Sequence, residues 1–149
     1  MNSYLSFPHF AEAFEMSNRQ NISSGGKYEK IVGYSRAVRV GDTVFVSGTS
    51  GLGENESNFD SRKESYEQTK RAIQKIDDAL RAAKCSLKDV VLTRIFLSRN
   101  ADWKEVARAH SEFFAEILPT NSMLVCEFLD PKILVEVEAQ AVVVTRTNP

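Results

Sequence analysis

The sequence predicts an α+β fold, in which a mixed β-sheet carries two helices packed on one face. Three observations support this prediction. Two stretches carry apolar residues at helical spacing, β-branched stretches flank them, and 42% of the 149 residues are hydrophobic, enough for one core. Because the helices interleave with the strands along the chain, we expect both to cover the same face of one sheet. We place this single domain at residues 18–149.

The first 17 residues, "MNSYLSFPHFAEAFEMS", are treated as an N-terminal extension. They contain scattered aromatic residues and Pro8, with no regular alternation typical of a strand. Two interpretations stay open. The extension is a flexible or loosely docked terminus, or it covers an apolar patch on its own or a neighbouring subunit.

The domain begins near Ile22 with a predicted turn, "SSGG". The stretch "YSRAVRVGDTVFVSG" follows and reads as two strands joined at Gly41-Asp42, where glycine supplies the backbone freedom of a hairpin turn. The polar, glycine-rich residues 48–59 are expected to form a loop. Its glycine spacing matches neither a phosphate-binding loop nor a dinucleotide-binding fingerprint.

A long amphipathic helix is predicted next, over "DSRKESYEQTKRAIQKIDDALRAAK". Ser61 and Glu64 are spaced for a capping box at its start. The apolar stripe of this helix comprises Tyr66, Thr69, Ile73, Ile76 and Leu80. This stripe is the side that we expect to face the sheet.

The second half of the chain repeats the pattern of strand and helix. "DVVLTRIFLS" is apolar on both faces, as expected of an inner strand. A second helix follows, with Asn100 or Asp102 as N-cap and Pro119 as its stop. "SMLVCEF" and "ILVEVEAQAVVVT" complete the sheet. His110 lies on the apolar stripe of the second helix, where we expect a core histidine with a hydrogen-bond partner.

Composition excludes several functional classes. The 19 basic and 20 acidic residues give a formal charge of −1, so no global field attracts a polyanion and we do not expect nucleic acid as a partner. The cysteines Cys85 and Cys126 are far apart, and with only two histidines we expect no metal site. No apolar run approaches the roughly 20 residues that span a bilayer. We therefore expect a cytoplasmic protein without membrane contact.

The sheet face without helices would be bare in a monomer. Strands such as "VVLTRIFL" and "VEVEAQAVVV" offer apolar side chains on more than one face. Because large exposed apolar faces mark interfaces, we expect this face to be buried against other copies of the chain. The sequence thus predicts a homo-oligomer.

Two pairs of polar residues are candidates for chemistry. Glu136 and Glu138 are two residues apart on one predicted strand and so point to the same side. They are either a solvent-facing pair, or one of them lines a cleft and activates a water as a general base. Tyr34 and Ser47 lie on the two strands of the hairpin and are either surface residues or neighbours in one site.

Three blocks of the sequence stand out together: "GYSRAVRVGDTVFVSGTSG", "LRAAKCSLKDVVLTRIFL" and "LPTNSMLVCEFLDPKILVEVEA". In order and spacing they resemble the RidA (YjgF-type) reactive-intermediate deaminases. The resemblance implies a chorismate-mutase-like subunit in a homotrimer with three clefts between subunits. It also implies cofactor-free hydrolysis of enamines and imines to 2-oxo acids and ammonia. The pocket positions carried over are Tyr34, Ser47, Asn121, Met123 and Glu136, of which Glu136 would position the water.

The sequence departs from the family at Asn121, where the resemblance implies an arginine that binds the substrate carboxylate. A guanidinium offers a carboxylate two charge-assisted bonds, worth roughly 1.5–3 kcal/mol, whereas an amide brings no charge. Met123 offers no hydrogen-bonding replacement. Arg36, on the same side of its strand as Tyr34, either faces solvent or brings the missing charge to the cleft.

Three functions follow as hypotheses. The first is a small-molecule ligand site for carbonyl or imine compounds, with hydrolysis by Glu136 and altered specificity, so that the protein is a hydrolase if it is an enzyme. The second is a non-catalytic trimer that senses a ligand or binds a partner. The third is an endoribonuclease, which ranks last because the sequence shows no basic stripe with interleaved aromatic residues.

Overall fold

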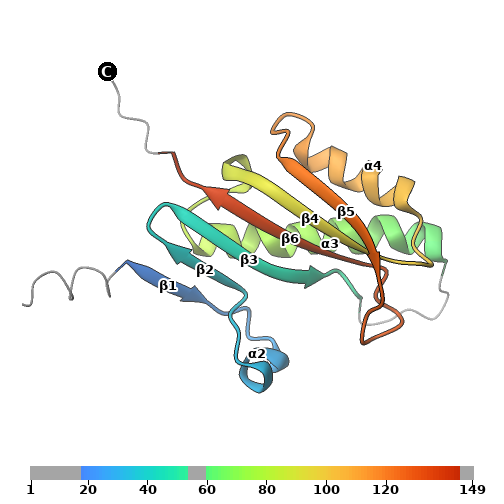
Figure 1. Cartoon of the computed structure of the whole chain (residues 1–149), viewed down its shortest axis with the longest axis horizontal. Helices are drawn as coiled ribbons and strands as arrows, with labels where there is room; N and C mark the ends of the chain where they lie inside the picture. Colours follow the sequence, from blue (N-terminus) through green and yellow to red (C-terminus); the bar gives the residue numbers. More distant parts are fainter. Residues whose placement is uncertain (1–17, 54–59, 145–149) are drawn as a thin grey trace, which may run out of the picture.

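The computed structural model describes residues 18–53 and 60–144. Within these ranges, six strands form one sheet in the order β1-β2-β3-β6-β4-β5 (Figure 1). Neighbouring strands are antiparallel except β4 and β5, which run parallel. The predicted mixed sheet is confirmed. The N-terminal extension lies outside the described residues, so both of its interpretations stay predictions.

The strands are β1 Arg19–Ile22, β2 Ala37–Val40, β3 Thr43–Ser50, β4 Val90–Ser98, β5 Thr120–Cys126 and β6 Val135–Val142. The helices are α2 Lys27–Val32, α3 Ser61–Ala82 and α4 Trp103–Phe114, with a 3-10 turn η1 at Leu87–Asp89. None of the helices in the described ranges is long and apolar enough to cross a membrane.

The core lies between the sheet and the long helix. Both α3 and α4 cover one face of the sheet, as predicted (Figure 1). Of the predicted stripe of α3, Tyr66 is only partly buried and Thr69 is buried, and the apolar residues Ile73, Ile76 and Leu80 are completely inaccessible to solvent. They pack in one cluster with inward side chains of the sheet, such as Val44 and Val137. Burial of such side chains provides the main driving force for folding.

The opposite face of the sheet carries large exposed side chains. Phe45 on β3 is 49% exposed, and Val40 at the end of β2 is 45% exposed. Along β6, fully buried residues alternate with half-buried ones, so the open face is partly polar. Arg94 of β4 and Glu138 of β6 form an ion pair of 3.4 Å between neighbouring strands. The homotrimer stays a prediction that this open face motivates.

Some local details differ from the sequence-based expectations. Strand β1 and helix α2 were not expected, and β3 extends to Ser50, into the predicted loop. The predicted capping box at Ser61 is wrong, because Asp60 is the N-cap and accepts hydrogen bonds from the Arg62 and Lys63 amides. A carboxylate at this position also interacts favourably with the helix dipole. At α4, the cap is Asp102.

Candidate functional site

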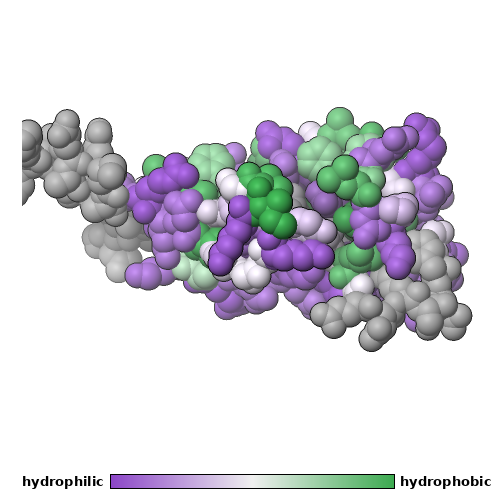
Figure 2. Space-filling model, turned by 90° about the horizontal axis from the view of Figure 1, so that it is seen from below, coloured by the Kyte–Doolittle hydropathy of each residue, from purple (hydrophilic) through white to green (hydrophobic). Residues whose placement is uncertain are grey.

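A groove opens beside the C-terminal end of β3. Its walls come from α2 with the turn before it, from the groove-facing side of α3, and from residues 127–131. Its polar lining includes Tyr34 and Arg36, just before β2, and Glu136 of β6. Figure 2 views the molecule from the side of α2 and shows hydrophobic patches separated by hydrophilic side chains. The groove therefore combines apolar walls with a few converging polar groups, as small-molecule sites do.

An irregularity in the sheet opens the groove at this place. Strand β2 begins at Ala37, opposite Val46, so the end of β3 has no β2 residue beside it. The β3–β6 register shifts between Val46 and Thr49, as at a β-bulge. Bulges bend a strand and redirect its side chains, and they are common beside functional sites.

Arg36 fills the gap left by β2. Its Nη1 atom donates to the Gly48 carbonyl oxygen and to Thr49 Oγ1, both at 2.9 Å. Its Nη2 atom lies 3.4 Å from the Tyr34 hydroxyl. Arg36 thus lines the groove, and its role toward a ligand stays a prediction.

Glu136 of β6 is half-buried and pairs with Ser50 on the neighbouring strand β3. A Cβ atom on Gly48 would stand only 2.9 Å from Glu136 Oε2, so the carboxylate occupies the space that this glycine leaves free. Burial raises the pKa of Glu136, the Arg36 charge opposes this rise, and Glu138 adds to it. A carboxylate with a raised pKa is a better proton acceptor than a solvated one.

The two strand carboxylates have different surroundings. Both point to the less buried side of β6, as predicted. Glu138 is paired with Arg94 on the open face, whereas Glu136 lines the groove. Of the two, only Glu136 therefore has the setting of a general base.

Tyr34 and Ser47 do not line the groove together. Tyr34 lines the groove. The Ser47 hydroxyl donates to the Ser35 carbonyl oxygen at 2.7 Å, across the hairpin, and Ser47 is not among the described lining residues. Its hydroxyl thus supports the local backbone in this chain.

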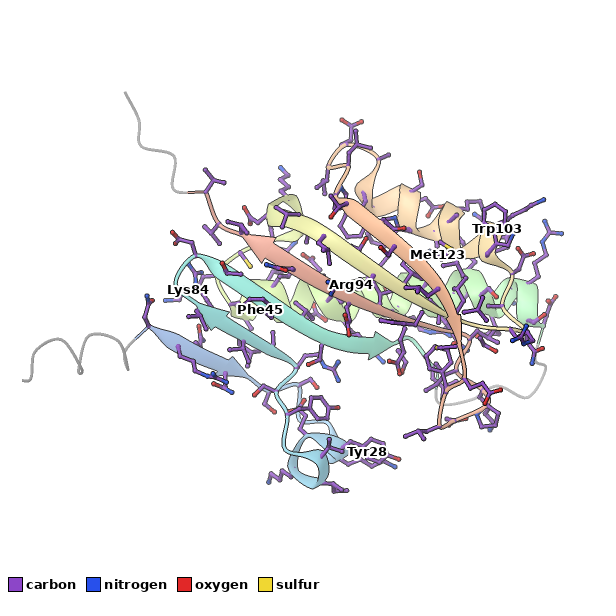
Figure 3. The ribbon with its side chains drawn as sticks, viewed as in Figure 1. Tyr28, Phe45, Lys84, Arg94, Trp103 and Met123 are labelled. Carbon is purple, nitrogen blue, oxygen red and sulfur yellow. The ribbon has the colours of Figure 1, made fainter. Side chains whose placement is uncertain are left out.

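Asn121 and Met123 lie on β5, the edge strand farthest from β1. Figure 3 shows Met123 well separated from Tyr28, which projects from α2 at the groove. Asn121 Nδ2 donates to Thr93 Oγ1 at 3.0 Å. Neither residue is among the described lining residues of its own chain, so their predicted role at the site requires a second copy of the chain.

His110 has the partner expected of a core histidine. Its Nε2 atom lies 3.0 Å from Thr93 Oγ1, and burial lowers its pKa. Cys85 and Cys126 are free thiols whose pKa values burial raises, as is typical of structural cysteines.

Lys75 also lines the groove and was not among the residues predicted from sequence. It projects from α3 and donates from Nζ to the Ser50 carbonyl oxygen at 3.0 Å. In the sequence it is one of several charged residues on the polar side of the helix. Only the packing of α3 against the end of β3 distinguishes it from the others.

The family model for endoribonuclease L-PSP matches residues 26–143, most of the chain. The chain belongs to the L-PSP/YjgF (RidA) family. This membership confirms the resemblance found in the sequence. Together with the six-stranded mixed sheet, it also confirms the chorismate-mutase-like fold.

The L-PSP/YjgF relatives carry different names. A RutC family protein of Pyrococcus abyssi is 34% identical over 72% of this chain and 84% of its own length. The 2-iminobutanoate/2-iminopropanoate deaminase of mouse is 30% identical over 83% of this chain and 91% of its own. The crystal structure of Rv2704 from Mycobacterium tuberculosis, described as a YjgF/YER057c/UK114 family member, is 40% identical with a TM-score of 0.74. That match covers 84% of this chain and 99% of Rv2704.

Proposed function

We propose that this protein binds a small imine or enamine in the groove and hydrolyses it, with Glu136 as the general base. The observation that supports this proposal most strongly is the position of the Glu136 carboxylate. It is half-buried, lies beside Gly48 and is near the Arg36 guanidinium. The deaminase name of the mouse relative supports the same reaction class.

The reaction needs one water and one proton acceptor. The water oxygen adds to the imine carbon while Glu136 accepts a proton from it. Glu136 passes that proton to the nitrogen, which gives a neutral carbinolamine. It then takes the hydroxyl proton and passes it to the nitrogen as the carbon–nitrogen bond breaks, so that ammonia leaves and the carbonyl forms. An enamine first accepts a proton on carbon and loses one from nitrogen, and so becomes the imine. The hydrolysis therefore needs only the imine, one water and the Glu136 carboxylate, and no oxidant or reductant.

Arg36 supplies the positive charge that Asn121 lacks. Its contacts with Gly48 and Thr49 hold the guanidinium at the groove, and Tyr34 lies on its other side. An arginine held in this way is preorganised for an anionic group, because less side-chain freedom is lost when the ligand binds.

The proposed assembly is a homotrimer in which a neighbouring copy completes each groove. Asn121 and Met123 then approach the groove from that copy. The exposed apolar side chains of the helix-free face and of β5 support an interface. Mass measurement in solution tests the assembly: a monomer would contradict it.

The activity is tested by ammonia release from 2-iminopropanoate generated in situ, for wild type, Glu136→Ala and Asn121→Arg. We expect turnover in wild type and its loss in Glu136→Ala. Turnover only in Asn121→Arg would contradict the proposal and favour the ligand-sensing alternative. RNA cleavage that depends on Glu136, without ammonia release, would favour the endoribonuclease alternative.

A further inference from the structure

A second cation stands beside Arg36 at the open edge of β3. Arg36 donates to the Gly48 carbonyl oxygen and Lys75 to the Ser50 carbonyl oxygen. Carbonyl groups two residues apart on an extended strand point to the same edge, roughly 6.6 Å apart. Two cationic side chains therefore bind the carbonyl groups at the end of β3, where β2 offers no partner: Arg36 from the residues before β2, and Lys75 from α3.

Both cations keep hydrogen-bond donors for a ligand. A guanidinium has five N–H groups and an ammonium has three. Arg36 uses three in its contacts with Gly48, Thr49 and Tyr34, and Lys75 uses one in its contact with Ser50. Among the described residues, no carboxylate forms an ion pair with Lys75.

The groove lining is not positively charged as a whole, because Lys27, Arg36 and Lys75 share it with the carboxylates of Asp78, Glu127, Asp130 and Glu136. An anionic ligand therefore needs a local pair of cations. Arg36 lies near Glu136, and Lys75 is the second cation at the edge of β3. Partial burial, Arg36 and Arg71 all lower the pKa of Lys75, which agrees with its position among cations. A bound anion relieves this repulsion.

We infer that Lys75 is a ligand-binding residue that acts with Arg36 to hold the acidic group of an anionic imine or its 2-oxo acid product. The inference rests on the proposed function and deepens it, because it names a residue that binds the carboxylate of the substrate. Neutral carbonyl compounds are then bound more weakly. Lys75 takes no part in proton transfer to the substrate.

The test measures binding of pyruvate, an anionic product, and pyruvamide, its neutral analogue, by NMR titration of the full chain. Lys75→Met removes the charge and keeps most of the apolar stem, whereas Lys75→Arg keeps the charge. Lys63→Met, in the first turn of the same helix and outside the groove lining, is the matched control. We expect Lys75→Met to weaken pyruvate binding about tenfold and pyruvamide binding less than twofold. Lys75→Arg and Lys63→Met are expected to stay within about threefold of wild type.

Unchanged pyruvate binding in Lys75→Met would overturn the inference, as would an equal loss for both ligands or no pyruvate binding to wild type. Failure of the proposed function alone gives a different result. Wild type then binds pyruvate in a Lys75-dependent manner but releases no ammonia from 2-iminopropanoate. If wild type releases ammonia and Lys75→Met binds pyruvate normally, the proposed function stands without this inference.

Discussion

Asn121 Nδ2 donates to Thr93 Oγ1 at 3.0 Å, and the same hydroxyl lies 3.0 Å from His110 Nε2. Thr93 is completely buried, so the Asn121 amide is attached to the interior of its own chain. A hydrogen bond to a buried group holds the amide in place. We therefore expect position 121 to contribute to the stability of the β4–β5 pair.

Asn121→Ala is expected to affect stability more than activity. The substitution removes one partner of the buried Thr93 hydroxyl and should cost about 1 kcal/mol in the free energy of unfolding. Because the amide brings no charge, kcat/KM for 2-iminopropanoate should change less than about threefold. Urea denaturation and ammonia release measure the two effects. A tenfold activity loss at unchanged stability would show that Asn121 binds the substrate.

Gly48→Ala is expected to move the Glu136 carboxylate with little effect on stability. The added Cβ would stand 2.9 Å from Glu136 Oε2, the end of a side chain that can rotate away. A misplaced base should lower kcat by about 10- to 100-fold. Steady-state kinetics and thermal melting separate the two effects.

The double variant Gly48→Ala with Glu136→Gln is the control. If Gly48 acts through Glu136, the double variant should be no slower than Glu136→Gln alone. Additive losses would mean that the glycine serves another purpose.

Glu29→Gln is expected to weaken the turn before α2 in a pH-dependent manner. The Glu29 carboxylate accepts hydrogen bonds from the Ser23 hydroxyl and from the amide and hydroxyl of Ser24. These bonds lower the pKa of Glu29 from 4.5 to about 2. Since the folded-state pKa is the lower one, the stabilisation is complete above pH 4.5 and is lost as the pH falls toward 2.

Chemical denaturation from pH 7 down to pH 2 measures this effect. Glu29→Gln should be less stable than wild type at pH 7, and the difference should shrink below pH 4.5. The exposed Glu116→Gln variant is the control for loss of a carboxylate. A stability difference that is constant with pH would contradict the assignment.

Gln68→Leu is expected to lower the stability of the protein by detaching residues 132–134 from α3. These residues follow the segment 127–131, which forms one wall of the groove. Gln68 is completely buried, and its amide donates to the Lys132 carbonyl oxygen and accepts from the Leu134 amide, both at 2.9 Å. Leucine leaves both backbone groups unpaired, at a cost of about 1–3 kcal/mol. The exposed Gln74→Leu variant is the control in urea denaturation. Equal stability of the two variants would contradict this role.

The main elements were predictable because their patterns are long and regular. The stripe of α3 holds Ile73, Ile76 and Leu80 at helical spacing, and β6 alternates over eight residues. Strand β1 has only four residues, "RQNI", of which one is buried, so it gives no such signal. Helix α2 is also short, although Gly26 and Gly33 flank it at its two caps.

The site was predictable only in part. Two-residue spacing on a strand made Glu136 and Arg36 candidates, because it fixes a common side. The choice of Glu136 over Glu138, and of Tyr34 as a pocket residue, rested on the resemblance to the RidA family. Lys75 could not be found in this way, because the register of α3 on the sheet is a tertiary property. The pairing of Asn121 with Thr93 joins residues of two parallel strands, and no local pattern specifies such a register.

The most direct test of the central claim is the pH dependence of kcat/KM for 2-iminopropanoate in wild type, Glu136→Gln and Arg36→Gln. Because the base acts ionised and burial raises its pKa, the wild-type rate should increase through an apparent pKa above 4.5. Glu136→Gln should lose this limb and at least about 100-fold in rate, whereas Arg36→Gln should keep the limb and mainly raise KM. An unchanged acid limb in Glu136→Gln would contradict the assignment of Glu136 as the base.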